Sequence, residues 1–533
     1  MQAMNRGKPS LRQVLTIAFA VVALSLAAEY GARYFSEQQV RKRALSPARV
    51  LLEQAFRTAS EEHDLDLLVR IALVQANAGE VFAAVRTIRS AKSVEWRNDR
   101  FADLAGTLSA RGQVAAALEV ASAMEATFPG KPVTLSKVAQ AQASAGDIAA
   151  AQETAGGLSG YLQADILEAV ALRQVLDNDI RGAFRTFASI DLPGDVARRS
   201  RILIAIAVRL ADSDRVADAL GAAAKVHESW KARALSEVSQ ALARRKHFTR
   251  AARIAASIRN DAYTQAMTFV ELARTREKFG DKSGAERHRA VELAAVIPAP
   301  EYKSLALRAA AESAAETGDW AAALAIAAEI GEIPHRMLAL TSIAIAQRTS
   351  GAGDAGRATV ASAGEVVRSA KGVEAADNAL FWLVEMHVRM GDLPSALAAA
   401  PRLADANGIS PCLAFSELAM AQAAAGDATG ARRSLDSIRV ENPNGLVSCT
   451  REGSRYAAVE AAVSAKHLHA AMSLAGAGAE QCDMDRSVAA GLVGIGDLDG
   501  SARWTYSRGS KLFEGCALLG MAEQTLNPDA ARP

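Results

Sequence analysis

The sequence is poor in aromatic residues and has almost no net charge. Only 5% of its 533 residues are aromatic although 50% are hydrophobic, so the apolar content is mostly Ala, Leu, Val and Ile. This composition predicts an almost wholly helical protein, because Ala is the best helix former. A formal charge of +2 gives no electrostatic reason to expect a nucleic-acid partner. We interpret local basic runs, such as the one from Arg198 to Arg201, as solvated helix ends.

Motifs of catalysis and of metal binding are also missing. None of the eight histidines has the His-Glu-x-x-His spacing of a helical zinc site, and no Gly-x-Ser-x-Gly elbow occurs. The stretch GLVGIGDLDG, from Gly491 to Gly500, lacks both the Lys-Ser/Thr of a phosphate loop and the complete acidic set of a calcium loop. We therefore expect no cofactor, no metal and no catalytic motif.

Long apolar runs are absent except near the N-terminus. Arg6, Lys8 and Arg12 precede a run from Val14 to Ala28, which is the pattern of a secretory signal. A helix of this length spans about 22 Å, short of the roughly 30 Å hydrocarbon core, which favours cleavage over retention as a signal anchor. Residues 1–28 are thus expected to be a signal peptide or a signal anchor. Cleavage predicts a periplasmic or secreted protein, and retention predicts an inner-membrane protein with its body outside the cytoplasm.

The body of the chain consists of a sequence repeat of about 35 residues. A Gly-Asp-like turn recurs thirteen times at separations of 31 to 40 residues, which is the signature of a helical solenoid. Gly suits this point because a helix that stops and reverses commonly ends in a left-handed residue. The turn residues, which we call anchors, are Gly79, Gly112, Gly146, Asn178, Asp214, Lys246, Gly280, Gly318, Gly351, Gly391, Gly426, Ala465 and Gly496.

Fixed offsets from the anchors predict how the two helices of a repeat pack. In twelve of the thirteen repeats, the residues seven before and five after the anchor are both small, as in Ala139/Ala151 and Ala273/Ala285. Small residues facing each other let antiparallel helices approach closely, so each repeat is predicted to be an αα-hairpin. An Asp directly after the anchor suits the N-cap of the second helix. This Asp occurs at Asp147, Asp319, Asp392, Asp427 and Asp497.

With its small residue, Gly-Asp turn and following Ala, AAESAAETGDWAAALAIAAEI (Ala310 to Ile330) resembles a tetratricopeptide repeat (TPR). The resemblance covers roughly Leu65 to Leu526. It departs from the family where Ala, Ile and Leu replace the usual aromatic residues, and most repeats lack the closing Pro. The resemblance implies an all-α, right-handed superhelix of about 13 αα-hairpins, whose concave surface is lined by first helices and holds other polypeptides. We expect a spacer or capping helix over 29–60, the solenoid over 61–526 and a flexible tail over 527–533.

Mapping the family's groove positions onto this chain gives a mixed-charge cluster that would suit an extended peptide. A solvated helix face explains the same residues, because Arg308 and Glu312 are four apart. The leading hypothesis is an exported, non-catalytic scaffold for protein or peptide partners, with the membrane engaged only by an uncleaved N-terminal segment. The alternative is an envelope hydrolase on a helical superhelix or toroid, with carboxylates from Glu277, Glu312 and Glu385. The groove residues are Gln240, Arg274, Glu277, Arg308, Glu312, Arg348 and Glu385.

The four cysteines all lie in the last quarter of the chain, with separations of 37, 33 and 34 residues. An even count in an exported protein favours disulfides, and no Cys-x-x-Cys is present. Equivalent positions in stacked helices lie about 9–10 Å apart, whereas a disulfide needs Cα atoms within about 7 Å, so small displacements at the helix starts are required. The favoured pairs are Cys412–Cys449 and Cys482–Cys516, which would clamp the terminal repeats.

Overall fold

The computed structural model describes residues 47–192, 194–259, 261–280, 284–403, 409–438, 449–476, 482–507 and 510–527. The expected signal segment, most of the expected spacer and residues 528–533 of the tail lie outside these ranges. Most described residues are helical and none of them is in a strand, which confirms the all-α prediction. Within the described ranges, no helix combines the length and apolarity needed to span a membrane.

The described chain forms thirteen consecutive αα-hairpins, each made of a first helix (A) and a second helix (B). A helix over residues 47–61 precedes them, α28 (Lys511–Leu526) follows them, and a short 3-10 helix, η1 (Ala400–Leu403), extends α21. The hairpins are α2 (Leu65–Asn77) with α3 (Val81–Arg89), α4 (Val94–Ala110) with α5 (Val114–Ser122), α6 (Lys131–Ala145) with α7 (Ile148–Gly156), α8 (Gly160–Leu176) with α9 (Ile180–Ser189), α10 (Val196–Asp212) with α11 (Val216–Ala224), α12 (Glu228–Arg244) with α13 (Phe248–Ala256), α14 (Ala262–Lys278) with α15 (Ala285–Ala295), α16 (Pro300–Glu316) with α17 (Trp320–Ala328), α18 (Ile333–Thr349) with α19 (Gly353–Ser369), α20 (Val373–Arg389) with α21 (Leu393–Ala399), α22 (Ile409–Ala424) with α23 (Ala428–Asp436), α24 (Arg451–Ser464) with α25 (Leu468–Ala475), and α26 (Cys482–Gly494) with α27 (Leu498–Ser507).

Left-handed residues make the turns, as predicted, at twelve of the thirteen anchors. The exception is the turn between α24 and α25, where Ala465 has φ −80° and the left-handed residue is Lys466, with φ 64°. The small residues at the fixed offsets, Ala458 and Ala470, placed this turn one residue too early. The five predicted Asp caps each accept a hydrogen bond from the backbone N–H three residues on, at 2.8–3.2 Å.

The small-residue offsets mark close contacts between the A and B helices. The Ser239 hydroxyl donates to the Ala251 carbonyl at 2.8 Å, and a Cβ on Gly356 would lie 3.2 Å from the Ala344 carbonyl. One predicted pair is wrong, because Ala285 is exposed and Ala290, at 1% exposure, is buried in its repeat. The connection from α14 to α15 is longer than in other repeats, which moves the buried position along α15 and accounts for the long spacing that follows Gly280.

A hydrogen bond inside four hairpins recurs at positions that the sequence analysis did not use. In each, a Gln four residues before the anchor bonds a Thr or Ser eight residues after it, at 2.7–2.8 Å, and both side chains are buried. Because the offsets from the anchor are the same in all four hairpins, these pairs could have been found in the sequence. The pairs are Gln75–Thr87, Gln174–Thr186, Gln347–Thr359 and Gln422–Ser434.

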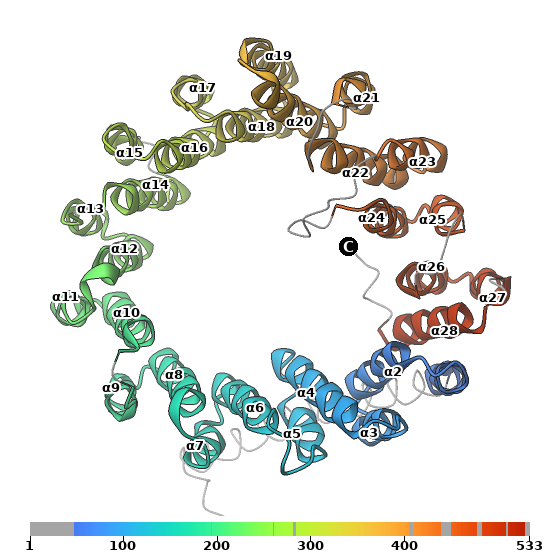
Figure 1. Ribbon diagram of the computed structural model, residues 1–533. Coiled ribbons are helices and arrows are strands. Elements are labelled where there is room, and N and C mark those ends of the chain that lie inside the picture. The colour runs from blue at the N-terminus through green and yellow to red at the C-terminus, as the bar shows by residue number, and fades with distance from the viewer. Residues whose placement is uncertain are drawn as a thin grey trace, which may run out of the picture. The chain divides into compact units, whose positions relative to one another are not determined.

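The chain divides into two compact units. Unit 2 runs from Ala91 to Ala477 and contains the hairpins from α4 to α25. Within it the A helices lie side by side in one layer and the B helices in a second, and the A layer is on the inner side of the unit's curve (Figure 1). Cys412 and Cys449 are joined in this unit, with Cα atoms 6.1 Å apart.

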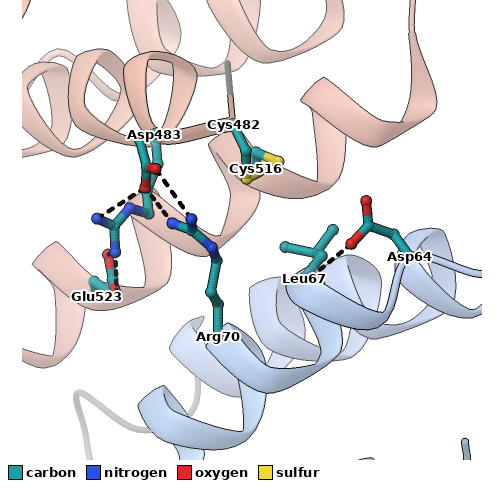
Figure 2. Close-up of a disulfide and its surroundings, with 8 residues drawn as sticks. Asp64, Leu67, Arg70, Cys482, Asp483, Cys516 and Glu523 are labelled. Atoms are coloured by element: carbon teal, nitrogen blue, oxygen red, sulfur yellow. Dashed lines mark hydrogen bonds and ion pairs between the residues drawn. A yellow bond between two sulfur atoms is a disulfide. The ribbon is translucent and has the colours of Figure 1, made fainter. Parts of the chain in front are cut away.

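Unit 1 combines the two ends of the chain, and its described part comprises residues 47–90, 482–507 and 510–527. Here α2 packs against α28, and Arg70 of α2 pairs with Asp483 of α26 (Figure 2). Lys511 of α28 pairs with Glu61 at 2.7 Å. Cys482 and Cys516 join α26 to α28, with Cα atoms 5.2 Å apart. Both favoured cysteine pairings are therefore present, because the helix starts approach more closely than evenly stacked helices would.

The helix over residues 47–61 takes the place of the B helix that α28 lacks. Its buried residues Leu52, Ala55 and Ala59 have the spacing of Val81, Ala84 and Ile88 in α3. The Thr58 methyl would lie 3.0 Å from a Cβ on Gly515 of α28. The two ends of the sequence thus contribute one helix each to a final, two-part repeat.

Candidate partner-binding face

Polar contacts connect neighbouring A helices along much of unit 2. We call these residues the polar seam, and they lie on the A layer that the TPR resemblance assigns to the groove. The seam comprises Ser136, Gln140, Asp165, Glu168, Arg198, Arg201, Ser236, Gln240, Thr268, Arg274, Arg308, Glu312, Glu316, His335, Ser342 and Arg348.

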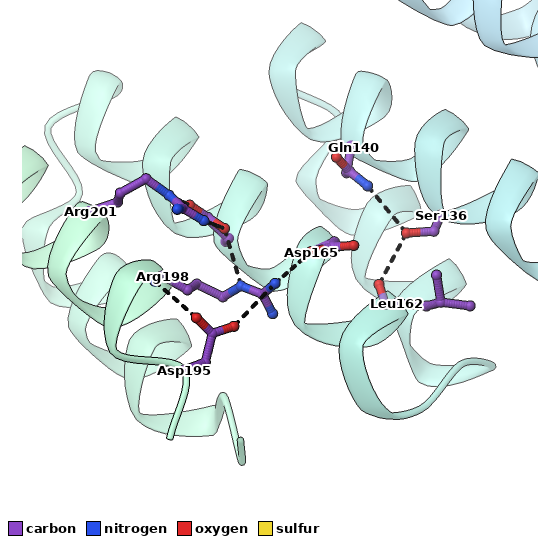
Figure 3. A network of polar contacts seen from close by, with 8 residues as sticks. Ser136, Gln140, Leu162, Asp165, Asp195, Arg198 and Arg201 are labelled. Carbon is purple, nitrogen blue, oxygen red and sulfur yellow. Dashed lines mark hydrogen bonds and ion pairs between the residues drawn. The ribbon is translucent and has the colours of Figure 1, made fainter. Parts of the chain in front are cut away.

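The part of the seam nearest the N-terminus joins α6, α8 and α10 (Figure 3). The Arg198 side chain is only 7% exposed and reaches Asp165 at 2.6 Å and Glu168 at 3.1 Å. Arg201 shares Glu168, at 2.6 Å, and is 45% exposed. The interpretation of this basic run as a solvated helix end is wrong for Arg198, because its buried guanidinium forms ion pairs with acidic residues of the preceding repeat.

The centre of the seam brings together three of the predicted groove residues. Arg274 of α14 lies 3.9 Å from Glu312 and 3.2 Å from Glu316, both on α16. Arg308 lies 3.6 Å from Glu312, at the i,i+4 spacing expected of a solvated helix face. The cluster therefore contains the intrahelical pair of a solvated helix face and also ion pairs between two repeats, and its role as a peptide-binding groove stays a prediction.

Burial changes the protonation behaviour of this cluster. The pKa of Glu312 lies above its ordinary value because burial outweighs the charges of Arg308 and Arg274. The pKa of His335 is lowered, first by burial and then by Arg308, whose guanidinium lies 3.4 Å from Nδ1. Ser342 of α18 lies 3.5 Å from Glu312. A half-buried carboxyl, a guanidinium and a neutral imidazole therefore lie together, a set that can both donate and accept hydrogen bonds.

Three other predicted groove residues lie on the A layer in different settings. Gln240 donates to the Ser236 hydroxyl at 3.2 Å, and Thr268 of the next A helix donates to the same oxygen at 2.7 Å. Arg348 donates to the backbone carbonyl of Met390, at the end of α20. Glu385 pairs with Arg389 on its own helix.

Glu277, also predicted in the groove, is instead buried between α14 and α15, where it pairs with Arg287. Both side chains are 7% exposed. Burial raises the pKa of Glu277 against the opposing charge of Arg287. The groove assignment is wrong here because Glu277 lies three residues before its anchor, a position that is buried in other repeats, as at Ala143, Ala211 and Ala315.

The carboxylates of the alternative hydrolase hypothesis each have a different ion-pair partner. Glu277 pairs with Arg287 between α14 and α15, Glu312 lies near Arg308 and Arg274, and Glu385 pairs with Arg389. A cleft of about 910 Å³ lies elsewhere, in unit 1, between residues 49–57 and the start of α3, with Phe82 84% exposed beside it. Among the described residues, no group of three His, Cys, Asp or Glu could hold a metal ion.

Comparison with known proteins gives likenesses of fold. No protein-family model matches the chain, and no curated protein matches its sequence. The structure of Naa15/Naa10 bound to HypK is 14% identical, with 91% of this chain and 80% of that chain covered and a TM-score of 0.39. The pentatricopeptide repeat protein PPR10 from maize is 16% identical over 93% and 73%, with a TM-score of 0.34. The APC/C hetero-tetramer Cut9–Hcn1 is 12% identical over 90% and 96%, with a TM-score of 0.22.

Proposed function

We propose that this protein is an exported, non-catalytic scaffold that binds protein or peptide partners along the A layer of unit 2. The observation that carries the proposal is the polar seam, which repeats donors and acceptors from one A helix to the next. Arg201 and Glu316 keep about half of their side-chain surface exposed, at 45% and 56%. An extended polypeptide passing along the A layer would meet these charged groups and form charge-assisted hydrogen bonds with them.

The proposed location is the periplasm or the cell exterior, with anchoring through residues 1–28 if they are retained. The N-terminal signal pattern supports export. The pairing of all four cysteines, two by two, also supports it, because disulfides persist in oxidising compartments. Mass spectrometry of the protein purified from its native cells would show whether the mature chain begins after residue 28.

Photo-crosslinking in intact cells tests the binding face with matched controls. A photoreactive amino acid replaces Glu316 or Arg201 on A helices, and Asp218 or Arg289 on B helices in parallel. The B positions have similar side-chain exposure, 55% and 52%, so chance encounters are balanced. We expect the same protein adduct from both A positions and none from the B positions.

Equal adducts from both layers, or adducts from the B layer alone, would overturn the assignment of the binding face. No adduct from any position would count against the scaffold function itself. The hydrolase alternative would then be tested with the Glu312→Gln and Glu385→Gln variants, and loss of a hydrolytic activity in them would replace the scaffold proposal.

A further inference from the structure

We propose that the Cys482–Cys516 disulfide is a redox-sensitive clamp that a dithiol reductant opens, and that its reduction weakens the contact between the two ends of the chain. The proposal concerns unit 1 and is independent of the partner-binding face. It rests on where the two cysteines lie, on their different exposures, and on the contrast with the second cysteine pair.

Each cysteine of the clamp adjoins a contact made with the N-terminal helices. Cys482 begins α26 and is followed directly by Asp483, which bonds Arg70 of α2 (Figure 2). Cys516 follows Gly515, whose added Cβ would lie 2.9 Å from Leu67 of α2. The disulfide therefore holds together the two helices on which both contacts depend.

The remaining contacts between α26 and α28 include the ion pair of Arg486 with Glu523, at 3.1 Å. The same Arg486 lies 3.3 Å from Asp483, so it links the carboxylate that receives Arg70 to α28. Without the covalent bond, the first turn of α26 is held by such polar contacts and by packing, and its start is free to fray.

The two disulfides differ in the solvent exposure of their cysteines. Cys482 is partly exposed, whereas its partner Cys516 is fully buried. Cys412 and Cys449 are both buried, at 3% and 6% exposure. Thiol–disulfide exchange requires a thiolate to reach one sulfur, so Cys482, the more exposed partner, is the expected point of attack.

The exchange balances as an ordinary two-electron reduction. One thiolate of the dithiol attacks the Cys482 sulfur, the S–S bond breaks, and Cys516 leaves as a thiolate that takes up a proton. The second thiol of the reductant then attacks the mixed disulfide and releases Cys482 as a thiol. The protein gains two electrons and two protons, and the reductant becomes a cyclic disulfide.

Graded reduction of the oxidised full-length protein with dithiothreitol, followed by alkylation and peptide mass spectrometry, tests the selectivity. We expect Cys482 and Cys516 to be alkylated at a reductant concentration at least about tenfold lower than Cys412 and Cys449. Simultaneous reduction of the two pairs, or earlier reduction of Cys412–Cys449, would overturn the proposal.

Hydrogen exchange of the selectively reduced protein tests the consequence. Amide protection of α2 should fall about tenfold, while that of α10 to α16 stays unchanged. The oxidised C482S/C516S variant should reproduce this loss, and the matched C412S/C449S variant should leave α2 protected. Unchanged protection of α2 after selective reduction would overturn the clamp. This measurement uses the wild-type protein, so it can be made even if a variant fails to fold.

Discussion

Arg70 and Asp483 are 413 residues apart in the sequence, yet their side chains form a bidentate ion pair between α2 and α26. One of its two hydrogen bonds joins Nη2 to Oδ2 at 3.0 Å. The pair lies in the compact unit that combines the first and last helices of the described chain. Its geometry ties the first repeat to the last one independently of the residues between them.

The stability contributed by this ion pair should depend on pH. Burial raises the pKa of Asp483, but the hydrogen bond and charge of Arg70, with the charge of Arg486, outweigh it, so the pKa lies below its usual value. A carboxyl with a depressed folded-state pKa stabilises the fold above its unfolded pKa, near 4, and loses that effect as the pH falls through the folded value. Each side chain is about one-third exposed, so the pair contributes about 0.5–1 kcal/mol.

Hydrogen exchange of α2 in the wild type and in Arg70→Met measures this contribution. At pH 6 the free energy of local unfolding of α2 should differ between the two proteins by the full contribution of about 0.5–1 kcal/mol. This difference should shrink as the pH falls below about 4. Burial raises the pKa of Glu523 and the charge of Arg70 lowers it, so the titration of Glu523 also contributes to the difference between the two proteins. Arg57→Met is the control, because Arg57 is 71% exposed and pairs with Glu53 of its own helix. A difference that stays constant with pH would show that Arg70 acts through packing alone.

The buried bond between Gln347 and Thr359 gives a second prediction. The Thr359 hydroxyl donates to the Gln347 amide oxygen at 2.7 Å, with the two residues 2% and 1% exposed. Thr359→Val leaves that oxygen buried without this donor and should destabilise the α18–α19 hairpin by about 1–3 kcal/mol. Local unfolding free energies from hydrogen exchange provide the measurement. The double variant with Gln347→Leu should recover most of the loss, and equal losses in the single and double variants would contradict the expectation.

The buried pair of Glu277 and Arg287 should respond asymmetrically to substitution. Arg287→Leu leaves the Glu277 carboxylate with one buried charge partner fewer, which should cost about 3–5 kcal/mol in the α14–α15 hairpin. Removing both charges, with Glu277→Leu as well, should cost clearly less. Urea unfolding followed by hydrogen exchange of this hairpin compares the variants. A double variant as unstable as the single one would show that the ion pair itself, and not the stranded charge, determines stability.

Gly520 is predicted to be irreplaceable in α28. A Cβ at this position would collide with the backbone carbonyl of Arg486 in α26, so Gly520→Ala must push the two helices apart. Gly221 in α11 is the matched control, because a Cβ there meets nothing within 4 Å. Gly221→Ala should stabilise its helix by up to about 1 kcal/mol, whereas Gly520→Ala should lower the thermal stability of unit 1. A neutral Gly520→Ala variant would show that α26 and α28 pack less tightly than described.

The repeats could be predicted from the sequence because each depends on residues only a few turns apart. Gly-Asp turns, capping aspartates and small residues at fixed offsets act within one hairpin, so a pattern of about 35 residues contains the physical requirement. Prediction failed where a connection changed length. The longer turn before α15 moved the buried position from Ala285 to Ala290, and it brought Arg287 of α15 against Glu277 of α14.

The joining of the ends was not predictable in this way. The contacts of Arg70 with Asp483, and of Lys511 with Glu61, connect residues more than 400 positions apart and follow no repeat offset. The same holds for the helix over residues 47–61, which the sequence suggested only as a spacer or cap. Its buried spacing of Leu52, Ala55 and Ala59 matches that of a B helix, and this signal is visible only once the packing of other B helices is known.

A zero-length carbodiimide crosslink between Lys511 and Glu61 is the most direct test of the joined ends. The Lys511 ammonium lies 2.7 Å from the Glu61 carboxylate, close enough for an amide bond to form without a spacer. Mass spectrometry of the monomer fraction should find a peptide joining these two residues. A crosslink between Lys231 and Glu228, which lie 3.0 Å apart on α12, confirms that the reaction worked. The Lys231–Glu228 crosslink without the Lys511–Glu61 crosslink would contradict the joining of the first and last repeats.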